Sequence, residues 1–379
     1  MGINKSKLLL ILIFGAISLI SCQNKKMEEK FKWAGGISAP KEYQMQVYFG
    51  QIIADDFQYG YSDIVGTIQG GWGNVNEAMG SSDVLHEIPH TLEFTWFSVV
   101  ENKYYAGHWD LDTVKITKLF KEGFTTTKFD YSLNKMAPIK GTYDLISVGM
   151  APGGKLVLWL SGAGNQVEVG FFQAKEIEIT KEEAYEDFQY TYKPNYRSIA
   201  LNSQSNGGFV DDLVHKKIQE EGYPDPKIYE DFRERFNWRL KIILANGNII
   251  ENRRLEMCNG EKETIYHNEN NIVAYNKRAI PYNFDFDWKD ENGKKYHSEI
   301  AFTGNTEYIR QANKMYNGTF LPLDFNKTEI YKLFREKLDK NASIDIVVDV
   351  SSNKDAVVYV EQNGTKFPLK EMDKYAEPY

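Results

Sequence analysis

The feature that most constrains the fold of this 379-residue chain is a repeat, in which the second half follows the pattern of the first. Aligning Trp288 with Trp96 brings further residues into register without a gap, namely Ile88-Pro89 with Ile280-Pro281, Phe94 with Phe286, and Lys103-Tyr104 with Lys295-Tyr296. Further along, Ile330 to Phe334 matches Ile116 to Phe120. Several matches in the same order indicate a duplicated unit. Such a repeat takes precedence over secondary structure assigned from short stretches of sequence.

Within each unit the pattern is typical of short strands with one short helix. Leu92, Phe94 and Trp96 alternate with polar residues, which predicts a strand with one buried face. The aromatic content of 14% also favours strands. We therefore expect a mainly β (β-rich α+β) fold. It should contain two similar antiparallel β-sheet or sandwich domains, each with one short helix, joined by a partly helical segment. The pattern does not separate a sandwich from a curved sheet covered by its helix.

The length suits two domains, and shifts in pattern place their boundaries. The expected segments are a signal peptide at 1–21, a tether at 22–30, a first β-rich repeat at 31–180, a helical or loop linker at 181–225, a second β-rich repeat at 226–372, and a tail at 373–379. Trp96 and Trp288 should occupy equivalent positions, and no sheet should run through both halves.

The N-terminus has the layout of a secretory signal. Lys5 and Lys7 precede an apolar run from Leu8 to Ile20 that is too short to span a bilayer. Leu19 to Cys22 resembles the bacterial lipobox. This resemblance implies cleavage before Cys22, a diacylglycerol on its sulfur and an acyl chain such as palmitate on its amine. Because Gln23 and not aspartate follows, the resemblance implies the outer membrane, facing the periplasm or the cell surface.

Several motifs of the first half together resemble one family of proteins. These are Ser38 to Pro40 with Tyr43, the loop Gly71 to Gly73, Pro89 with Trp96, and Val148 to Gly154 through Trp159 and Gly162. They are similar to Gram-negative envelope lipoproteins catalogued only as a domain of unknown function, and the resemblance is strongest over residues 31–180. The family implies no activity that carries over to this chain.

Composition and motifs disfavour several kinds of chemistry. The chain carries −8, and the expected signal peptide holds two lysines and no acid, so neither nucleic acid nor an anionic membrane surface is an expected partner. His86 and His90 are separated by Pro89, which disfavours a helical metal site. We expect Cys258 to be a packed thiol and not a nucleophile. We expect Asp285, Asp287 and Asp290 to be solvent-facing acids and not a calcium loop. We expect no catalytic, cofactor-binding or metal-binding residues and no cofactor.

Tryptophans in or near loops are the best indications of binding. Trp72 lies among glycines, where no regular core pattern requires an aromatic residue, so Trp72, Asn74 and Trp109 are the candidate partner-binding residues. The alternative is that each tryptophan packs in the interior.

Two classes of function remain, with a purely structural envelope role as a third. The first is a lipid-anchored, non-catalytic binding module for a protein or an envelope glycan, one version being immunity against an incoming toxin. The second is an envelope glycan hydrolase, which needs only two suitably spaced loop carboxylates. The absence of a catalytic signature favours the binding module.

Overall fold

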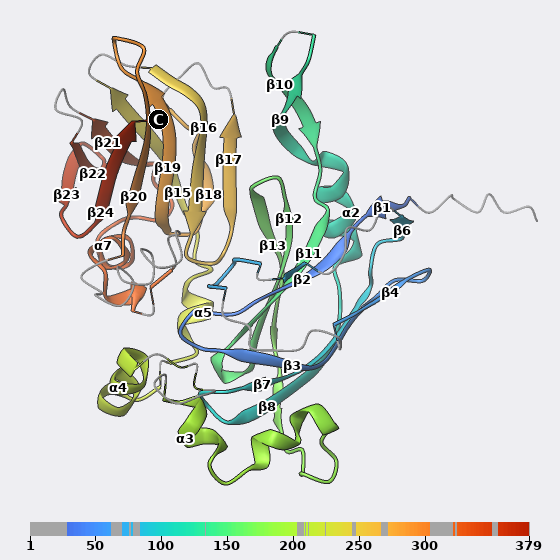
Figure 1. Ribbon diagram of the computed structural model, residues 1–379. Coiled ribbons are helices and arrows are strands. Elements are labelled where there is room, and N and C mark those ends of the chain that lie inside the picture. Colours follow the sequence, from blue (N-terminus) through green and yellow to red (C-terminus); the bar gives the residue numbers. More distant parts are fainter. Residues whose placement is uncertain are drawn as a thin grey trace, which may run out of the picture.

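The computed structural model describes residues 29–61, 70–75, 77–78, 84–132, 134–202, 208, 210, 212–223, 225–244, 248–266, 272–303, 321–322, 324–350 and 355–378. Over these residues the chain is mainly β, with several antiparallel sheets and a few short helices, as the sequence predicts (Figure 1). The expected signal peptide and Cys22 lie outside the described residues.

The first repeat builds two groups of five strands. One is a separate sheet with the order β14 (Lys175–Ile177), β8 (Lys103–Asp110), β7 (Thr91–Ser98), β3 (Met45–Ile53) and β4 (Gln58–Gly60). The other has the order β13 (Asn165–Gln173), β12 (Lys155–Gly162), β11 (Leu145–Ala151), β2 (Ala34–Ser38) and β5 (Glu77–Ala78). Buried side chains of both groups, among them Trp96 and Leu158, form one core, so this repeat is a sandwich.

The second repeat has the same two groups in the same order. The first runs β24 (Asp373–Pro378), β20 (Lys295–Ala301), β19 (Pro281–Lys289), β16 (Asn248–Met257) and β17 (Lys262–Tyr266). The second is a separate sheet of β23 (Thr365–Leu369), β22 (Ala356–Gln362), β21 (Ile344–Val350), β15 (Phe236–Leu244) and β18 (Asn276–Arg278). Each repeat also contains one parallel pair at the same place, β2 with β11 and β15 with β21. The shared topology supports the duplication inferred from the sequence.

The matching tryptophans occupy equivalent strands, but the sequence register is off by one residue beyond them. Trp96 on β7 faces Tyr105 on β8, with ring centroids 5.6 Å apart. Trp288 on β19 stacks on Tyr296 of β20 at 4.7 Å. Tyr105, and not Tyr104, is therefore the counterpart of Tyr296, because the chain takes one residue more to pass from Trp96 to its cross-strand partner than from Trp288 to Tyr296.

One helix lies at the same point of each repeat. Helix α2 (Thr113–Glu122) follows β8 and buries Ile116 and Phe120. Helix α7 (Glu329–Glu336) follows β20 and the 3-10 turn η3 (Phe325–Lys327), and buries the matching Ile330 and Phe334 among others. Asp112 caps α2 and Thr328 caps α7 through a side-chain oxygen that accepts a backbone N–H. The helices thus join the core of their own repeat.

The expectation that no sheet runs through both halves is wrong. Strand β13 of the first repeat pairs with β17 of the second at Gln166 and Lys262, which joins one group of each repeat into a ten-stranded sheet. The residues expected as a tail also differ, since Asp373–Pro378 forms β24 and pairs with β20. The repeats are therefore one continuous structure and not two separate units.

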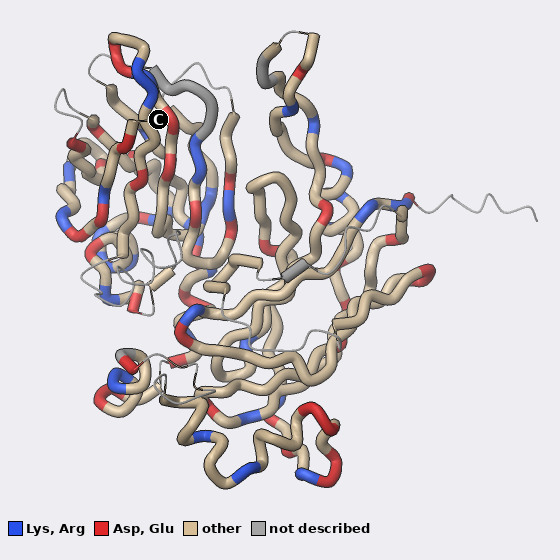
Figure 2. The backbone as a smooth tube through the Cα atoms, in the orientation of Figure 1, with Lys and Arg blue, Asp and Glu red and all other residues tan. Residues whose placement is uncertain are grey.

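Between the repeats lie short helices, as predicted for a partly helical linker. They are η2 (Glu186–Tyr192), α3 (Tyr196–Ala200) and α4 (Asp212–Glu221), followed by α5 (Ile228–Asp231) just before β15. The first repeat also has elements of its own: the small pair β1 (Phe31–Lys32) and β6 (Leu85–His86), the 3-10 turn η1 (Pro152–Gly154), and the hairpin β9 (Phe124–Asp130) and β10 (Lys135–Gly141). Basic and acidic residues occur along the chain of both repeats (Figure 2).

Candidate functional site

Trp72 is buried at the junction between the repeats and not exposed to an external partner. Its side chain is 3% exposed, and its ring lies 5.0 Å from Trp159 and 4.9 Å from Tyr229. It belongs to the core that is built mainly by the second repeat. The expectation that the fold does not require Trp72 is therefore corrected: the loop that carries it lacks a pattern because its packing partners are distant in the sequence.

The loop around Trp72 binds the second repeat of the same chain. Asn74 accepts a hydrogen bond from the ammonium group of Lys262, and the amide of Gln166 donates to the carbonyl of Gly73 at 2.7 Å. A Cβ on Gly73 would lie 2.6 Å from the Cα of Gly260, so the two loops touch backbone to backbone. Asn74 thus takes part, like Trp72, in the contact between the two repeats.

Trp109 lies elsewhere, on β8 of the first repeat. It is partly buried and stacks on Phe172 of β13, with ring centroids 5.2 Å apart and an interplanar angle of 29°. The structure therefore separates Trp109 from Trp72 and Asn74 and does not bring the three candidates into one site.

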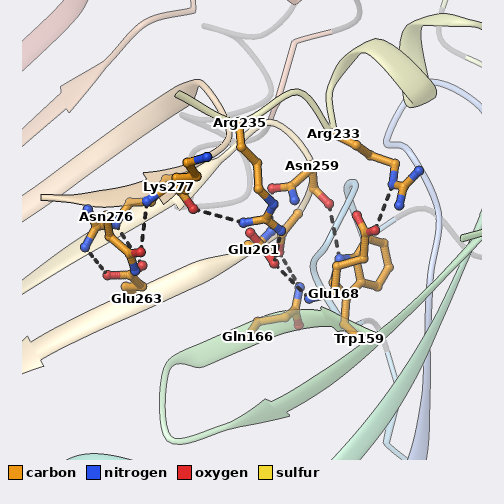
Figure 3. A network of polar contacts seen from close by, with 12 residues as sticks. Trp159, Gln166, Glu168, Arg233, Arg235, Asn259, Glu261, Glu263, Asn276 and Lys277 are labelled. Atoms are coloured by element: carbon orange, nitrogen blue, oxygen red, sulfur yellow. Dashed lines mark hydrogen bonds and ion pairs between the residues drawn. The ribbon is translucent and has the colours of Figure 1, made fainter. Parts of the chain in front are cut away.

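Two arginines fasten the junction from the segment between α5 and β15. Arg233 donates to the Glu168 carboxylate of the first repeat at 2.7 Å, and Arg235 donates to the Glu261 carboxylate of the second at 2.7 Å. The same Glu261 oxygen also accepts the backbone N–H of Glu168 at 3.0 Å. Figure 3 shows both arginines pointing toward these acids, beside the indole of Trp159. We call Glu168, Arg233, Arg235 and Glu261 the arginine clasp.

Burial dominates the electrostatics of the clasp. It raises the pKa of Glu168, and the adjacent Arg233 and Arg235 only partly offset this effect. Burial also opposes the charge of Arg235, but its hydrogen bond to Glu261 and the charges of Glu261, Glu168 and Glu263 together outweigh burial and raise the pKa of Arg235. One Glu168 oxygen, Oε2, is buried without a hydrogen-bond partner. These groups hold the repeats together and leave little surface for a ligand.

A cleft of about 600 Å³ lies beside this junction, between the linker and the second repeat. Helices α4 and α5 and the η3–α7 segment line it, together with Tyr43 of the first repeat. Tyr223 and Tyr331 supply further aromatic surface. Tyr43 lies 2% exposed, and burial raises its pKa far above the ordinary value, so its hydroxyl stays neutral.

Most charged groups of the cleft are paired. Three ion pairs connect its walls, Lys217 with Asp324 at 2.9 Å, Lys327 with Glu221 at 2.7 Å, and Arg335 with Asp231 at 3.5 Å. The hydrogen bond from Lys327 lowers the pKa of Glu221. Two further acids, Asp225 and Glu336, line the cleft outside these pairs, so its lining has a small excess of negative charge.

A second group of acids lies on the face of the ten-stranded sheet. Burial raises the pKa of Asp285 to about 6, with Arg254 acting against this shift and Glu256 adding to it. Glu299 lies directly opposite Asp285 on β20. Asp285 is therefore largely shielded, which corrects its assignment as a solvent-facing acid. This is the strongest perturbation of a carboxyl pKa toward neutrality among the described residues.

Other candidate chemistry is absent from the described part of the chain. No group of three or more His, Cys, Asp or Glu side chains there is arranged to hold a metal ion. Cys258 is fully buried, and burial raises the pKa of its thiol, which suits a packed residue and not a nucleophile. No helix among those described is both long and apolar enough to cross a bilayer.

Comparison with known protein families finds one family to which the chain is similar. A family model described as a protein of unknown function (DUF2931) matches residues 21–225, which is more than half of the sequence. The chain belongs to the DUF2931 family. This confirms the expected membership of a family without assigned function. No curated protein matches the chain.

The DUF2931 match covers the first repeat and the linker, and it ends before the arginine clasp is complete. Trp72, Asn74 and Glu168 lie inside the matched segment, whereas Arg233, Arg235 and Glu261 lie beyond it. Sequence reasoning missed the clasp. One signal was present: Glu168 interrupts the apolar strand from Val167 to Phe172, and a buried acid requires a partner.

Proposed function

We propose that this DUF2931 protein is a lipid-anchored lipoprotein of the outer membrane that binds a ligand and does not catalyse a reaction. The lipobox-like sequence ending at Cys22 supports the anchor. Palmitate or a similar acyl chain on the amine, together with the diacylglycerol, would provide the several chains that stable anchoring needs. The ligand is an envelope glycan or a protein.

The observation that carries the binding role is the cleft between the linker and the second repeat. Its volume of about 600 Å³ lies within the usual range of ligand sites. Tyrosines supply rigid aromatic surface with a polar tip, which suits glycan rings as well as peptides. The Lys217–Asp324 and Lys327–Glu221 pairs offset part of the charge, and Asp225 and Glu336 leave a small excess of acids. The cleft therefore favours an uncharged polar ligand over an anionic one, and a neutral glycan fits this description better than a highly charged toxin surface.

Site-specific photo-crosslinking in intact cells tests the cleft. Tyr223 lines it and is 48% exposed, whereas Tyr375 is 46% exposed on β24 and does not line it. We expect Tyr223→p-benzoylphenylalanine to form a discrete adduct that glycan-degrading enzymes shorten. The matched Tyr375 variant should form none. An adduct with a single protein would make a protein the ligand, and equal adducts at both positions would remove the cleft from the proposal.

The hydrolase alternative is favoured by one specific observation. Asp285 has a pKa near 6 and lies opposite Glu299, and a raised pKa is what a general acid of a glycoside hydrolase requires. Incubation of the purified protein with peptidoglycan and with lipopolysaccharide oligosaccharides tests this alternative. Release of reducing ends that Asp285→Asn abolishes without unfolding the protein would replace the binding role with an enzymatic one.

A further inference from the structure

The hairpin β9–β10 stands apart from the repeated architecture. It lies between α2 and β11, whereas the second repeat passes from α7 to β21 with no such hairpin among the described residues. Its two strands pair only with each other, and it projects from the body in Figure 1. Strand β9 contacts β17 of the second repeat and buries Thr126, so part of the hairpin joins the body. Two paired strands gain little stability by themselves, so an exposed tip calls for a role other than holding the fold together.

The tip of this hairpin exposes aromatic side chains. Tyr131 in the turn is 88% exposed and Phe129 is 40% exposed, and their rings contact each other edge to face at 5.1 Å. Asp130 accepts hydrogen bonds from the backbone and hydroxyl of Ser132, which fixes the turn. Tyrosine and phenylalanine on a fixed, exposed turn are suited to the interfacial region of a bilayer.

The charge of the hairpin is opposite to that of the chain. Lys128 and Lys135 lie toward the tip with the single acid Asp130, and Lys140 lies at the base opposite Thr125, so residues 124–141 are positive although the whole chain carries −8. Basic residues beside exposed aromatic groups favour a surface of anionic lipid headgroups.

The expected anchor enters the structure at the base of the same hairpin. The Lys121 ammonium group at the end of α2 pairs with Glu29, and Lys140 of β10 donates to the Lys121 carbonyl at 2.8 Å. Phe31 packs on Phe120 of the same helix at 5.1 Å. The first described residues of the chain are thus fixed where the hairpin begins.

The reach of the tether matches the height of the hairpin. Six residues lie between Cys22 and Glu29, and the seven Cα–Cα steps span at most about 25 Å at roughly 3.3–3.6 Å each. Strand β9 has seven residues and rises about 23 Å at roughly 3.3 Å each. A lipid on Cys22 and the tip at Tyr131 are therefore able to reach the same bilayer surface.

We propose that the β9–β10 hairpin is a second membrane contact, whose tip at Phe129 and Tyr131 inserts into the anionic headgroup region of the bilayer that holds the lipid on Cys22. This inference rests on the proposed lipid anchor. The lipid supplies attachment, and the hairpin supplies orientation. Because α4 and the linker lie at the opposite end of the molecule from the hairpin tip in Figure 1, this orientation turns the cleft away from the membrane.

A fluorescent label at the tip tests the proposal on the full lipoprotein. Cys258 is buried and Cys22 is expected to carry lipid, so a label added to Tyr131→Cys should react at one site. In vesicles of phosphatidylethanolamine and phosphatidylglycerol, we expect a nitrobenzoxadiazole label at 131 to shift to shorter emission wavelength and to be quenched by spin-labelled lipid. The control is Glu182→Cys, an exposed position in the linker, whose helices α3 and α4 lie at the other end of the molecule in Figure 1, and the label there should stay in water.

The outcomes separate the two proposals. Mass spectrometry that finds an unmodified Cys22 overturns the anchor, and the hairpin contact that depends on it. A lipidated chain whose label at 131 remains in water overturns the hairpin contact alone. A label at 131 that changes only when envelope proteins are added also overturns it, because the tip then binds a protein and not lipid.

Discussion

The indole N–H of Trp159 in the first repeat donates a hydrogen bond to the backbone carbonyl of Asn259 in the second, with 3.1 Å between the two heavy atoms. Trp159 is fully buried and lies against the ring of Trp72. The buried indole N–H of one repeat thus has its hydrogen-bond acceptor in the main chain of the other. The junction is therefore part of the folded core, and its residues should behave as core residues.

Replacing Trp72 should destabilise the protein. Truncation of a buried tryptophan costs about 3–5 kcal/mol, and we expect Trp72→Ala to lower the free energy of unfolding by about this amount. Trp96→Ala, in the core of the first repeat, should cost a similar amount. Thermal and urea unfolding of both variants check this. If Trp72→Ala unfolds like the wild type, the packing of Trp72 between the repeats is not what stabilises the junction.

Two glycines with similar backbone angles allow the cost of a close contact to be distinguished from the cost of backbone strain when each is replaced by alanine. Gly73 has φ of 76° and touches Gly260, whereas Gly293 has φ of 79° with open space around it. An alanine in the left-handed region costs about 1–2 kcal/mol at either position. Gly73→Ala should cost clearly more, because its Cβ would displace the opposing loop. Equal losses in urea unfolding would argue against a tight contact between the loops.

The arginine clasp should contribute to coupling between the repeats. Arg233→Met leaves the buried Glu168 of the first repeat without its cation from the second, and we expect a loss of about 1–3 kcal/mol in the free energy of unfolding. Glu168→Gln in the same chain should recover part of this loss, because it removes the uncompensated charge. Arg239→Met breaks the Arg239–Asp345 pair inside the second repeat and serves as the control. Calorimetry should resolve two transitions for Arg233→Met and one for the control. A single unchanged transition for Arg233→Met would mean that the clasp does not couple the repeats.

The raised pKa of Asp285 predicts a pH dependence of stability. An acid whose pKa rises from 3.8 to about 6 on folding favours the folded state below pH 4, and this contribution is lost as the pH rises through 6. The difference corresponds to roughly 3 kcal/mol. Asp285→Asn should therefore flatten the stability profile between pH 4 and 6 and make the protein more stable at pH 7. Urea unfolding across this range checks the sign, and a steeper profile in the variant would contradict it.

The proposed anchor depends on one atom, the sulfur of Cys22. We expect Cys22→Ser to remain unprocessed or free of lipid and to be lost from the outer membrane fraction after a high-salt wash, since no other acyl attachment site is proposed. Fractionation followed by mass spectrometry of the N-terminus makes the measurement. If the variant stays with the outer membrane after the wash, the lipoprotein assignment is wrong.

The strands, helices and repeat were predictable because their signals are local. Alternation around Trp96 and the helical spacing of Ile116 and Phe120 report which face of an element is buried, and the structure confirms both. The junction was not predictable in this way. Trp72 meets Trp159 and Tyr229 only after the chain has folded, so a loop without regular pattern was read as free surface. The one-residue offset at Tyr105 has a similar origin, because turn length sets the register.

The strand order of the repeats also determines how many copies can be joined. Strand β13 at one edge of the first repeat meets β17 at the opposite edge of the second, and their counterparts β23 and β4 end their own sheets. Such a head-to-tail contact does not close on itself and could in principle add copies without limit. The segment 267–275, which falls between β17 and β18 as the Trp72 loop falls between β4 and β5, contains neither tryptophan nor glycine. The second repeat thus lacks the side chain with which the first one holds its neighbour, and it does not offer the same contact to a further copy.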